Sequence, residues 1–134
     1  MTTTTTESCA TSTPIALAEP ALVPASLAGA AVAGGALLFD VRSAPTRERQ
    51  GGLPQARLAD RTRVAEQFGL DSAERFDGVD SLDRPIVVVC GSENGSRPVA
   101  EELVSLGFTN VVHVAGGFPA WAAAGLPATA GAGE

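Results

Sequence analysis

The residue best suited to chemistry in this sequence is Cys90, which follows the apolar run Ile86–Val89 and precedes the short polar stretch Gly91, Ser92, Glu93, Asn94, Gly95 and Ser96. A loop of small residues that leads into a helix presents successive backbone N–H groups and the positive end of a helix dipole. Such donors lower the pKa of a cysteine thiol from ~8.5 into the range ~3.5–7.5. Two interpretations stay open from these residues: Cys90 is a nucleophile, or it is a buried strand cysteine that acts as a small hydrophobic residue.

The apolar run before Cys90 predicts a central β-strand. Four apolar residues without polar alternation suit a strand covered on both faces, as in a parallel sheet beneath helices. Cys90 would then lie at the carboxyl end of that strand, where open α/β sheets bind their ligands. A helix is predicted over residues 97–106, because Val99, Leu103 and Leu106 form an apolar stripe.

A second pair of charged residues, Asp40 and Arg42, ends the apolar segment 36–41. If this segment is a strand parallel to the one before Cys90, both carboxyl ends lie at the same edge of the sheet. Asp40 could orient Arg42 beside the loop after Cys90, or it could cap the strand end by accepting from backbone N–H groups. Arg42 could pair with Asp40 or face an anionic ligand.

The only histidine and the second cysteine are further candidates for chemistry. His113 lies in the middle of the predicted strand 111–114, so we favour a packed or edge histidine over a Cys–His catalytic pair. Cys9 lies in the Thr- and Ser-rich segment 1–13, where it is an incidental thiol or a resolving thiol for Cys90.

The remaining elements alternate between strands and helices. Helices are predicted over 26–32, 46–50, 61–68 and 118–124, and strands over 36–41, within 53–58 and over 111–114. The acidic, turn-rich segment 71–84 predicts a solvated loop. This alternation predicts an α/β layer fold with a parallel sheet.

Composition narrows the classes of partner and compartment. The net charge of −6 argues against nucleic acid and anionic membranes as partners. Two cysteines do not form a disulfide framework, so a cytoplasmic, reducing compartment is expected. Proline and glycine interrupt the apolar stretch 15–39, which argues against a membrane span, and residues 1–7 carry no basic segment typical of a secretory signal.

The segment from about Val23 to Pro127 resembles a single-domain rhodanese (sulfurtransferase) module. Cys90 precedes Gly107-Phe108 by seventeen residues, which is the family's spacing. The other matching motifs are Leu38-Phe39-Asp40-Val41-Arg42, Gly52-Leu53-Pro54-Gln55-Ala56, Gly107-Phe108-Thr109-Asn110-Val111 and the closing block Gly116-Gly117-Phe118-Pro119-Ala120-Trp121-Ala122-Ala123-Ala124-Gly125-Leu126-Pro127.

The resemblance implies a rhodanese-like three-layer fold, with a central five-stranded parallel sheet and helices on both faces. We expect a low-complexity, disordered tail over 1–20, the rhodanese-like domain over 21–128 and a flexible tail over 129–134. The resemblance also implies that Cys90 takes a sulfane sulfur from thiosulfate or a persulfide and passes it to a thiol or cyanide. The N–H groups of Gly91 to Ser96 would hold the anionic persulfide, with Asp40, Arg42 and Arg97 in support.

No metal or organic cofactor is required by that chemistry. The expected partners are a small sulfur donor and a thiophilic acceptor, and the expected state is a monomer or weak homodimer. Many family members have a basic residue directly after the cysteine, glycine three residues on and arginine five residues on. This chain has Gly91, Glu93 and Gly95 at those positions, and it has Gly52 where the family often has histidine.

These departures bear on the choice of substrate. Like charges ~4 Å apart repel by ~4 kcal/mol at an effective dielectric constant of ~20. A carboxylate at Glu93 in the rim of an anion site therefore predicts poor use of thiosulfate, and Glu93→Gly is expected to improve it. Arg97 could reach back in compensation, but we expect it on the helix surface.

Two other functions stay open beside the sulfurtransferase. The first is a non-catalytic rhodanese-like module that senses thiols or binds a partner, and the changes at Glu93 and Gly95 keep it in view. The second is a cysteine phosphatase or arsenate reductase, which needs an arginine six residues after the cysteine to clamp an oxyanion. Ser96 stands at that position, so this function is the least favoured.

Overall fold

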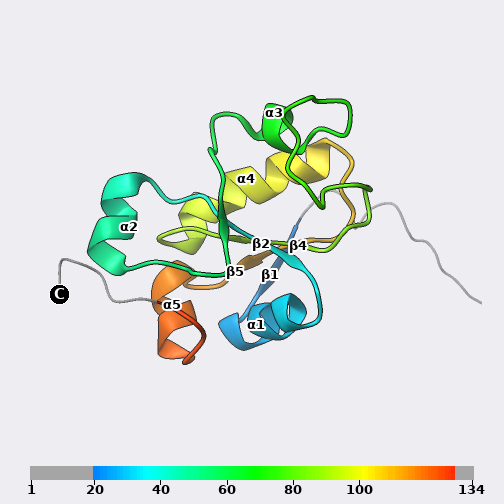
Figure 1. Cartoon of the computed structure of the whole chain (residues 1–134). Coiled ribbons are helices and arrows are strands. Elements are labelled where there is room, and N and C mark those ends of the chain that lie inside the picture. The colour runs from blue at the N-terminus through cyan, green and yellow to red at the C-terminus, as the bar shows by residue number, and fades with distance from the viewer. Residues whose placement is uncertain (1–19, 129–134) are drawn as a thin grey trace, which may run out of the picture.

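A computed structural model describes residues 20–128 as a five-stranded parallel sheet flanked by helices (Figure 1). The elements in chain order are β1 (Ala21–Val23), α1 (Ala25–Ala33), β2 (Leu37–Asp40), α2 (Ala44–Gln50), β3 (Arg57–Leu58), α3 (Val64–Phe68), β4 (Ile86–Val89), α4 (Glu93–Ser105), β5 (Val111–Val114) and α5 (Gly117–Ala123). The strand order is β1-β5-β4-β2-β3, and every strand pair is parallel. The predicted α/β class and five-stranded parallel sheet are confirmed.

The central strand β4 divides its side chains between two cores. Ile86, Val88 and Cys90 face the core beneath α3 and α4, whereas Val87 and Val89 face the core beneath α1 and α5. In Figure 1, α3 and α4 lie on one side of the sheet, and α1 and α5 lie on the other. Because successive strand side chains point to opposite faces, Cys90 lies on the side covered by α4.

The helix after Cys90 begins earlier than the sequence predicts. Residues 91–96 are expected to form a loop before a helix over 97–106, but α4 starts at Glu93 and ends at Ser105. Only Gly91 and Ser92 separate Cys90 from the first helical residue. Side-chain contacts of Glu93 and Ser96 with β5 and the corner after it anchor the first helical turn, and these contacts outweigh the weak helix preference of a Gly- and Ser-rich stretch.

The prediction of a solvated loop over 71–84 is wrong for part of the segment. Val79 is completely buried. The ring of Phe76 packs 5.0 Å from that of Phe39 and 5.4 Å from that of Phe68. Apolar packing of two side chains therefore fixes a segment whose composition is otherwise acidic and turn-rich.

Two smaller expectations also change in the structure. The helix predicted over 61–68 is shorter, because Asp60 accepts hydrogen bonds from Thr62 and the helix begins only at Val64. No strand is predicted before residue 36, but residues 21–23 form an edge strand, β1, which pairs with β5. Cys9 and the predicted tails, except Pro20, lie outside the described residues. Within residues 20–128, no helix has the length and apolar character to cross a membrane.

Candidate active site

Cys90 follows β4 directly and lies against the first turn of α4. Its side chain is buried on most sides, with a residue exposure of 6%. A Cβ atom placed on Gly95 would lie 2.4 Å from Cys90 Sγ, which is far inside a normal contact distance. The sulfur therefore occupies space that only a glycine at position 95 leaves free.

The turn after Cys90 contains unpaired backbone donors. The N–H groups of Gly91, Ser92, Glu93 and Asn94 have no hydrogen-bond acceptor within residues 20–128, whereas Gly95 N–H donates to the Ser92 carbonyl at 3.1 Å. The first N–H groups of a helix lack intrahelical partners, and they carry the positive end of the helix dipole. Such donors can stabilise negative charge on a sulfur or on a bound anion.

The Cys90 hollow is a small polar depression of about 270 Å³ beside the sulfur. Three of the predicted loop residues, Gly91, Ser92 and Gly95, contribute to its wall. The other residues that line it, apart from Cys90, are Ser43, Thr46, Arg49, Gln50 and Arg61. None of these five was singled out from the sequence as a site residue, because they come from α2, its N-cap residue Ser43, and the connection between β3 and α3.

Asp40 and Arg42 form a buried ion pair at the carboxyl end of β2. Arg42 Nη2 lies 2.7 Å from Asp40 Oδ2, and Arg42 Nε donates to Asp40 Oδ1 at 2.9 Å. Asp40 Oδ1 also accepts from the backbone N–H of Arg42 at 3.0 Å. Asp40 thus performs both roles considered from the sequence, and Arg42 pairs with it instead of facing an anionic ligand.

The ion pair connects to the turn after Cys90 through one side chain. Arg42 Nη1 donates to Gln50 Oε1 at 3.4 Å, and Gln50 Nε2 donates to the Gly91 carbonyl at 3.5 Å. The Arg42 guanidinium also lies 4.3 Å from the centre of the Phe118 ring, a distance at which cation and ring attract. Arg42 is therefore linked to the turn after Cys90 through Gln50.

Glu93 points toward the corner before α5, which is the turn at Ala115 and Gly116 between β5 and α5. Its Oε1 accepts from the backbone N–H of Gly116 at 3.0 Å, and its Oε2 lies 3.7 Å from Arg97 Nη2. Arg97 is on the helix surface, with 47% of its side chain exposed, as the sequence predicts. The carboxylate expected to repel an anionic donor has a structural partner in this corner.

The corner itself packs tightly on the turn after Cys90. Phe118 N–H donates to the Cys90 carbonyl at 2.8 Å. Gly117 has φ +65°, and a Cβ there would lie 2.8 Å from the Cys90 carbonyl oxygen and 2.7 Å from Ser92 N. A larger residue at Gly117 would therefore displace the turn that surrounds the sulfur.

Ser96 turns away from the sulfur and binds the only histidine. Both residues are buried, and Ser96 Oγ lies 2.9 Å from His113 Nδ1 and 3.2 Å from the Glu93 carbonyl. Burial, assisted by the charge of Arg97, holds the pKa of His113 below its usual value. The packed histidine predicted from the sequence is confirmed, and its hydrogen bond goes to Ser96.

Asn94, another of the predicted loop residues, lies beside a second hollow and not beside the Cys90 hollow. Asn94 lines an adjacent hollow of about 290 Å³ together with Arg61, Gly95, Pro98, Val99 and Glu102.

Within residues 20–128, no group of three or more His, Cys, Asp or Glu side chains is arranged to hold a metal ion.

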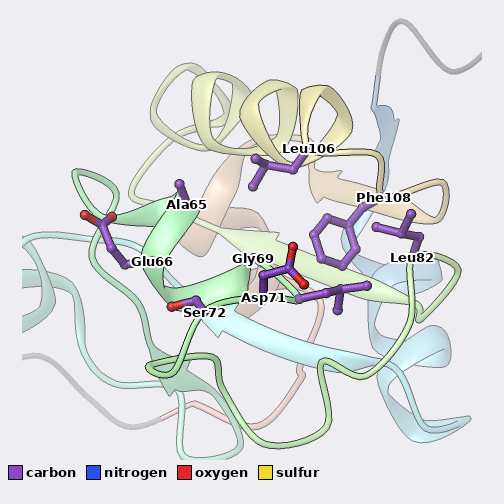
Figure 2. A pocket seen from close by; sticks show the side chains of 9 residues that line it. Ala65, Glu66, Gly69, Asp71, Ser72, Leu82, Leu106 and Phe108 are labelled. Atoms are coloured by element: carbon purple, nitrogen blue, oxygen red, sulfur yellow. The ribbon is translucent and has the colours of Figure 1, made fainter.

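A further hollow lies at the opposite end of α4 from Cys90. It has a volume of about 750 Å³, and Leu82, Leu106 and Phe108 line it together with residues of α3 and the loop that follows (Figure 2). Phe108 precedes β5 and Leu82 precedes β4, so this hollow lies at the amino ends of the strands. It contains neither the cysteine nor the turn with free N–H groups.

Comparison with known proteins agrees with this fold. The family model described as Rhodanese-like domain matches residues 23–124. Thiosulfate sulfurtransferase GlpE from Pseudomonas savastanoi pv. phaseolicola is 37% identical over 89 residues, which cover 66% of this chain and 74% of that protein.

Two solved structures share the fold. The rhodanese-like domain of the Alr3790 protein from Anabaena has a TM-score of 0.65 at 21% identity, and the match covers 85% of this chain and 81% of that chain. The polysulfide-sulfur transferase homodimer from Wolinella succinogenes has a TM-score of 0.64 at 20% identity, with coverage of 84% and 80%.

The sheet topology and the matched family model together define a rhodanese-like domain. The chain belongs to the rhodanese-like domain family. The predictions of a rhodanese module and of a rhodanese-type sulfurtransferase are confirmed as statements of protein family and enzyme class.

Proposed function

We propose that this rhodanese-type sulfurtransferase carries sulfur as a persulfide on Cys90. The Cys90 thiolate attacks the sulfane sulfur of thiosulfate, a Cys90 S–S bond forms, and the S–S bond of thiosulfate breaks to release sulfite. A second thiolate or cyanide then attacks the outer sulfur of the Cys90 persulfide. That step gives a new persulfide or thiocyanate and restores the Cys90 thiolate. With a persulfide as donor, the leaving group is a thiolate instead of sulfite.

One observation carries this proposal: Cys90 Sγ lies against Gly95, in a turn whose N–H groups from Gly91 to Asn94 have no acceptor within the described chain. An outer sulfur on Cys90 is anionic, and unpaired N–H donors stabilise an anion without any reorganisation of the site. The sulfur also lines an open hollow through which a small donor can approach. We assign the donors to the turn and the positioning of the turn to Asp40, Arg42 and Gln50.

The experiment is to detect the carrier state directly. Purified protein is incubated separately with thiosulfate, mercaptopyruvate and glutathione persulfide, and intact mass spectrometry measures a gain of one sulfur atom. We expect the gain in the unmodified chain and in a Cys9→Ser control, and its absence in Cys90→Ser. The gain should reverse when cyanide or a thiol is added.

The alternatives make different predictions in the same experiment. Failure of every donor to add sulfur would reject the carrier and favour a thiol sensor or partner-binding module. Turnover of a phosphate ester would instead support a cysteine phosphatase. Ser96 argues against the phosphatase, because its side chain is buried against His113 where that chemistry needs an arginine.

The proposal extends to partners and compartment. A small sulfur donor and a thiophilic acceptor suit a hollow of about 270 Å³. We propose a monomer or weak homodimer in the cytoplasm. The Wolinella relative is a homodimer, so light scattering across a range of protein concentrations is the appropriate test of the oligomeric state.

A further inference from the structure

Two arginines from outside the turn after Cys90 flank the hollow beside the sulfur. Arg49 lies in the last turn of α2, and Arg61 lies in the connection between β3 and α3. Both are exposed, and neither has a side-chain hydrogen bond or ion pair with another described residue. By contrast, Arg42 is bound to Asp40, and Arg47 donates to the Arg42 carbonyl at 2.6 Å. Two guanidinium groups are therefore available to a ligand of the Cys90 hollow.

Arg61 lies near the sulfur. The position that a Cβ of Gly95 would take lies 2.4 Å from Cys90 Sγ and 3.8 Å from Arg61 Nη1. These two distances limit the separation of Sγ and Nη1 to at most about 6 Å, a range in which charges interact strongly near a protein surface. An anionic oxygen accepts from a guanidinium at about 2.7–2.9 Å. An anionic group held by Arg61 would therefore stand close to the sulfur.

The electrostatic surroundings favour an anion in this hollow. No acidic residue lines it, although the whole chain has a net charge of −6. Asp60, which precedes Arg61 in the chain, accepts from Thr62, and Glu93 in the first turn of α4 accepts from Gly116 N–H. Glu102 lines the adjacent hollow, which Arg61 also borders. Cationic side chains are thus concentrated at the sulfur in a protein that is acidic overall.

We propose that Arg61, assisted by Arg49, is the anion-binding subsite that selects sulfur donors with a negatively charged leaving group. The inference rests on the proposed sulfur-carrier function of Cys90. Arg61 also borders hollows of about 380 Å³ and 290 Å³. The subsite therefore suits both a compact dianion such as thiosulfate and a larger persulfide whose carboxylates lie beyond the sulfane sulfur. The proposed subsite argues against the expectation of poor thiosulfate use, because Arg61 would supply the positive charge that the turn after Cys90 lacks.

The test uses two alkylating agents that differ by one charge. Iodoacetate and iodoacetamide react with the same Cys90 sulfur, and the ratio of their rate constants reports anion preference without any persulfide step. All variants carry Cys9→Ser, so that alkylation reports on Cys90. We expect Arg61→Ala to lower the iodoacetate/iodoacetamide ratio about tenfold and Arg61→Glu to lower it further, with Arg61→Lys retaining most of the preference.

Arg63→Ala is the matched control. Arg63 lies two residues from Arg61, is exposed and pairs with Glu74, and it does not line the Cys90 hollow. Its ratio should equal that of the parent chain. Equal ratios for Arg61→Ala and Arg63→Ala, in proteins that retain the parent circular dichroism spectrum, would overturn the assignment.

The second measurement separates the two donor classes. Arg61→Ala is expected to raise KM for thiosulfate about tenfold, with a smaller change in kcat, and the same comparison with glutathione persulfide shows whether the larger donor uses the subsite. If the alkylation ratio responds to Arg61 but no donor adds sulfur to Cys90, the anion subsite stands and the sulfur-carrier function fails. If sulfur is added equally well by the Arg61→Ala variant, the subsite fails and the carrier function stands.

Discussion

Replacing Gly95 with alanine would place a methyl group against the reactive sulfur. The new Cβ would lie 2.4 Å from Cys90 Sγ and 3.2 Å from Cys90 Cβ. Carbon atoms in good contact are about 3.5–4.0 Å apart, so the sulfur or the turn must move by about 1 Å. A misplacement of about 1 Å can lower the rate of a reaction about 10²-fold, whereas overpacking of this kind costs about 1–3 kcal/mol of stability. We expect sulfur addition to slow about 100-fold in a protein that remains folded.

The protein is allowed to react with thiosulfate, and samples are quenched at intervals. Intact mass spectrometry then measures the amount of sulfur adduct in each sample, which gives the rate. Gly34→Ala is the control, because the nearest atoms to a Cβ at that position are 3.5 Å away, an ordinary contact, and φ is −86°. Thermal unfolding of both variants reports the cost in stability. A Gly95→Ala protein with the parent rate would refute the reasoning, because the turn would then adapt without loss and could not be the element that positions the sulfur.

Three further changes test the surroundings of the site. Asp40→Asn leaves the Arg42 charge buried without its counterion, so the free energy of unfolding in urea should fall by about 3–5 kcal/mol; a loss below 1 kcal/mol would contradict a buried pair. Because the pKa of His113 is lowered in the folded state, the unfolded chain binds more protons, and stability should decline as the pH falls below 6.5; His113→Asn should flatten that decline. Glu93→Gln keeps an acceptor for Gly116 N–H, so thiosulfate kinetics should stay within about twofold, and a large gain would restore the repulsion argument.

The sheet could be predicted because runs of apolar residues that are contiguous in the chain identify its central strands. Ile86 to Val89 is a continuous β-branched run, and it is the buried strand that such a run predicts. The edge strand β1 was missed because three residues between Pro20 and Pro24 carry too little pattern to be distinguished from a turn. The packing of Phe76 and Val79 was missed for a related reason, since two apolar residues in an acidic segment become core only through contacts that are distant in sequence.

The residues of the site divide in the same way: some can be recognised from their neighbours in the chain, and others are brought to the site by segments that are distant in sequence. Cys90 could be found because strand, cysteine and turn are contiguous in the chain. Arg61 could not, because its approach to Gly95 depends on how the β3–α3 connection folds across the carboxyl edge of the sheet. The start of α4 at Glu93 likewise depends on hydrogen bonds to Gly116 and His113, which lie more than a dozen residues away.

The departures of this chain from the pattern of its family form a linked set. Many members have glycine three residues after the cysteine and arginine five residues after it, whereas this chain has Glu93 and Gly95. With α4 beginning at Glu93, residue 95 lies directly against Cys90 Sγ, where a Cβ would be 2.4 Å from the sulfur. An arginine at 95 is therefore incompatible with this turn, and the nearby Arg61 guanidinium, 3.8 Å from that same Cβ position, can replace its charge. The side chain at 93 binds Gly116 and so stabilises the early helix start that makes Gly95 necessary.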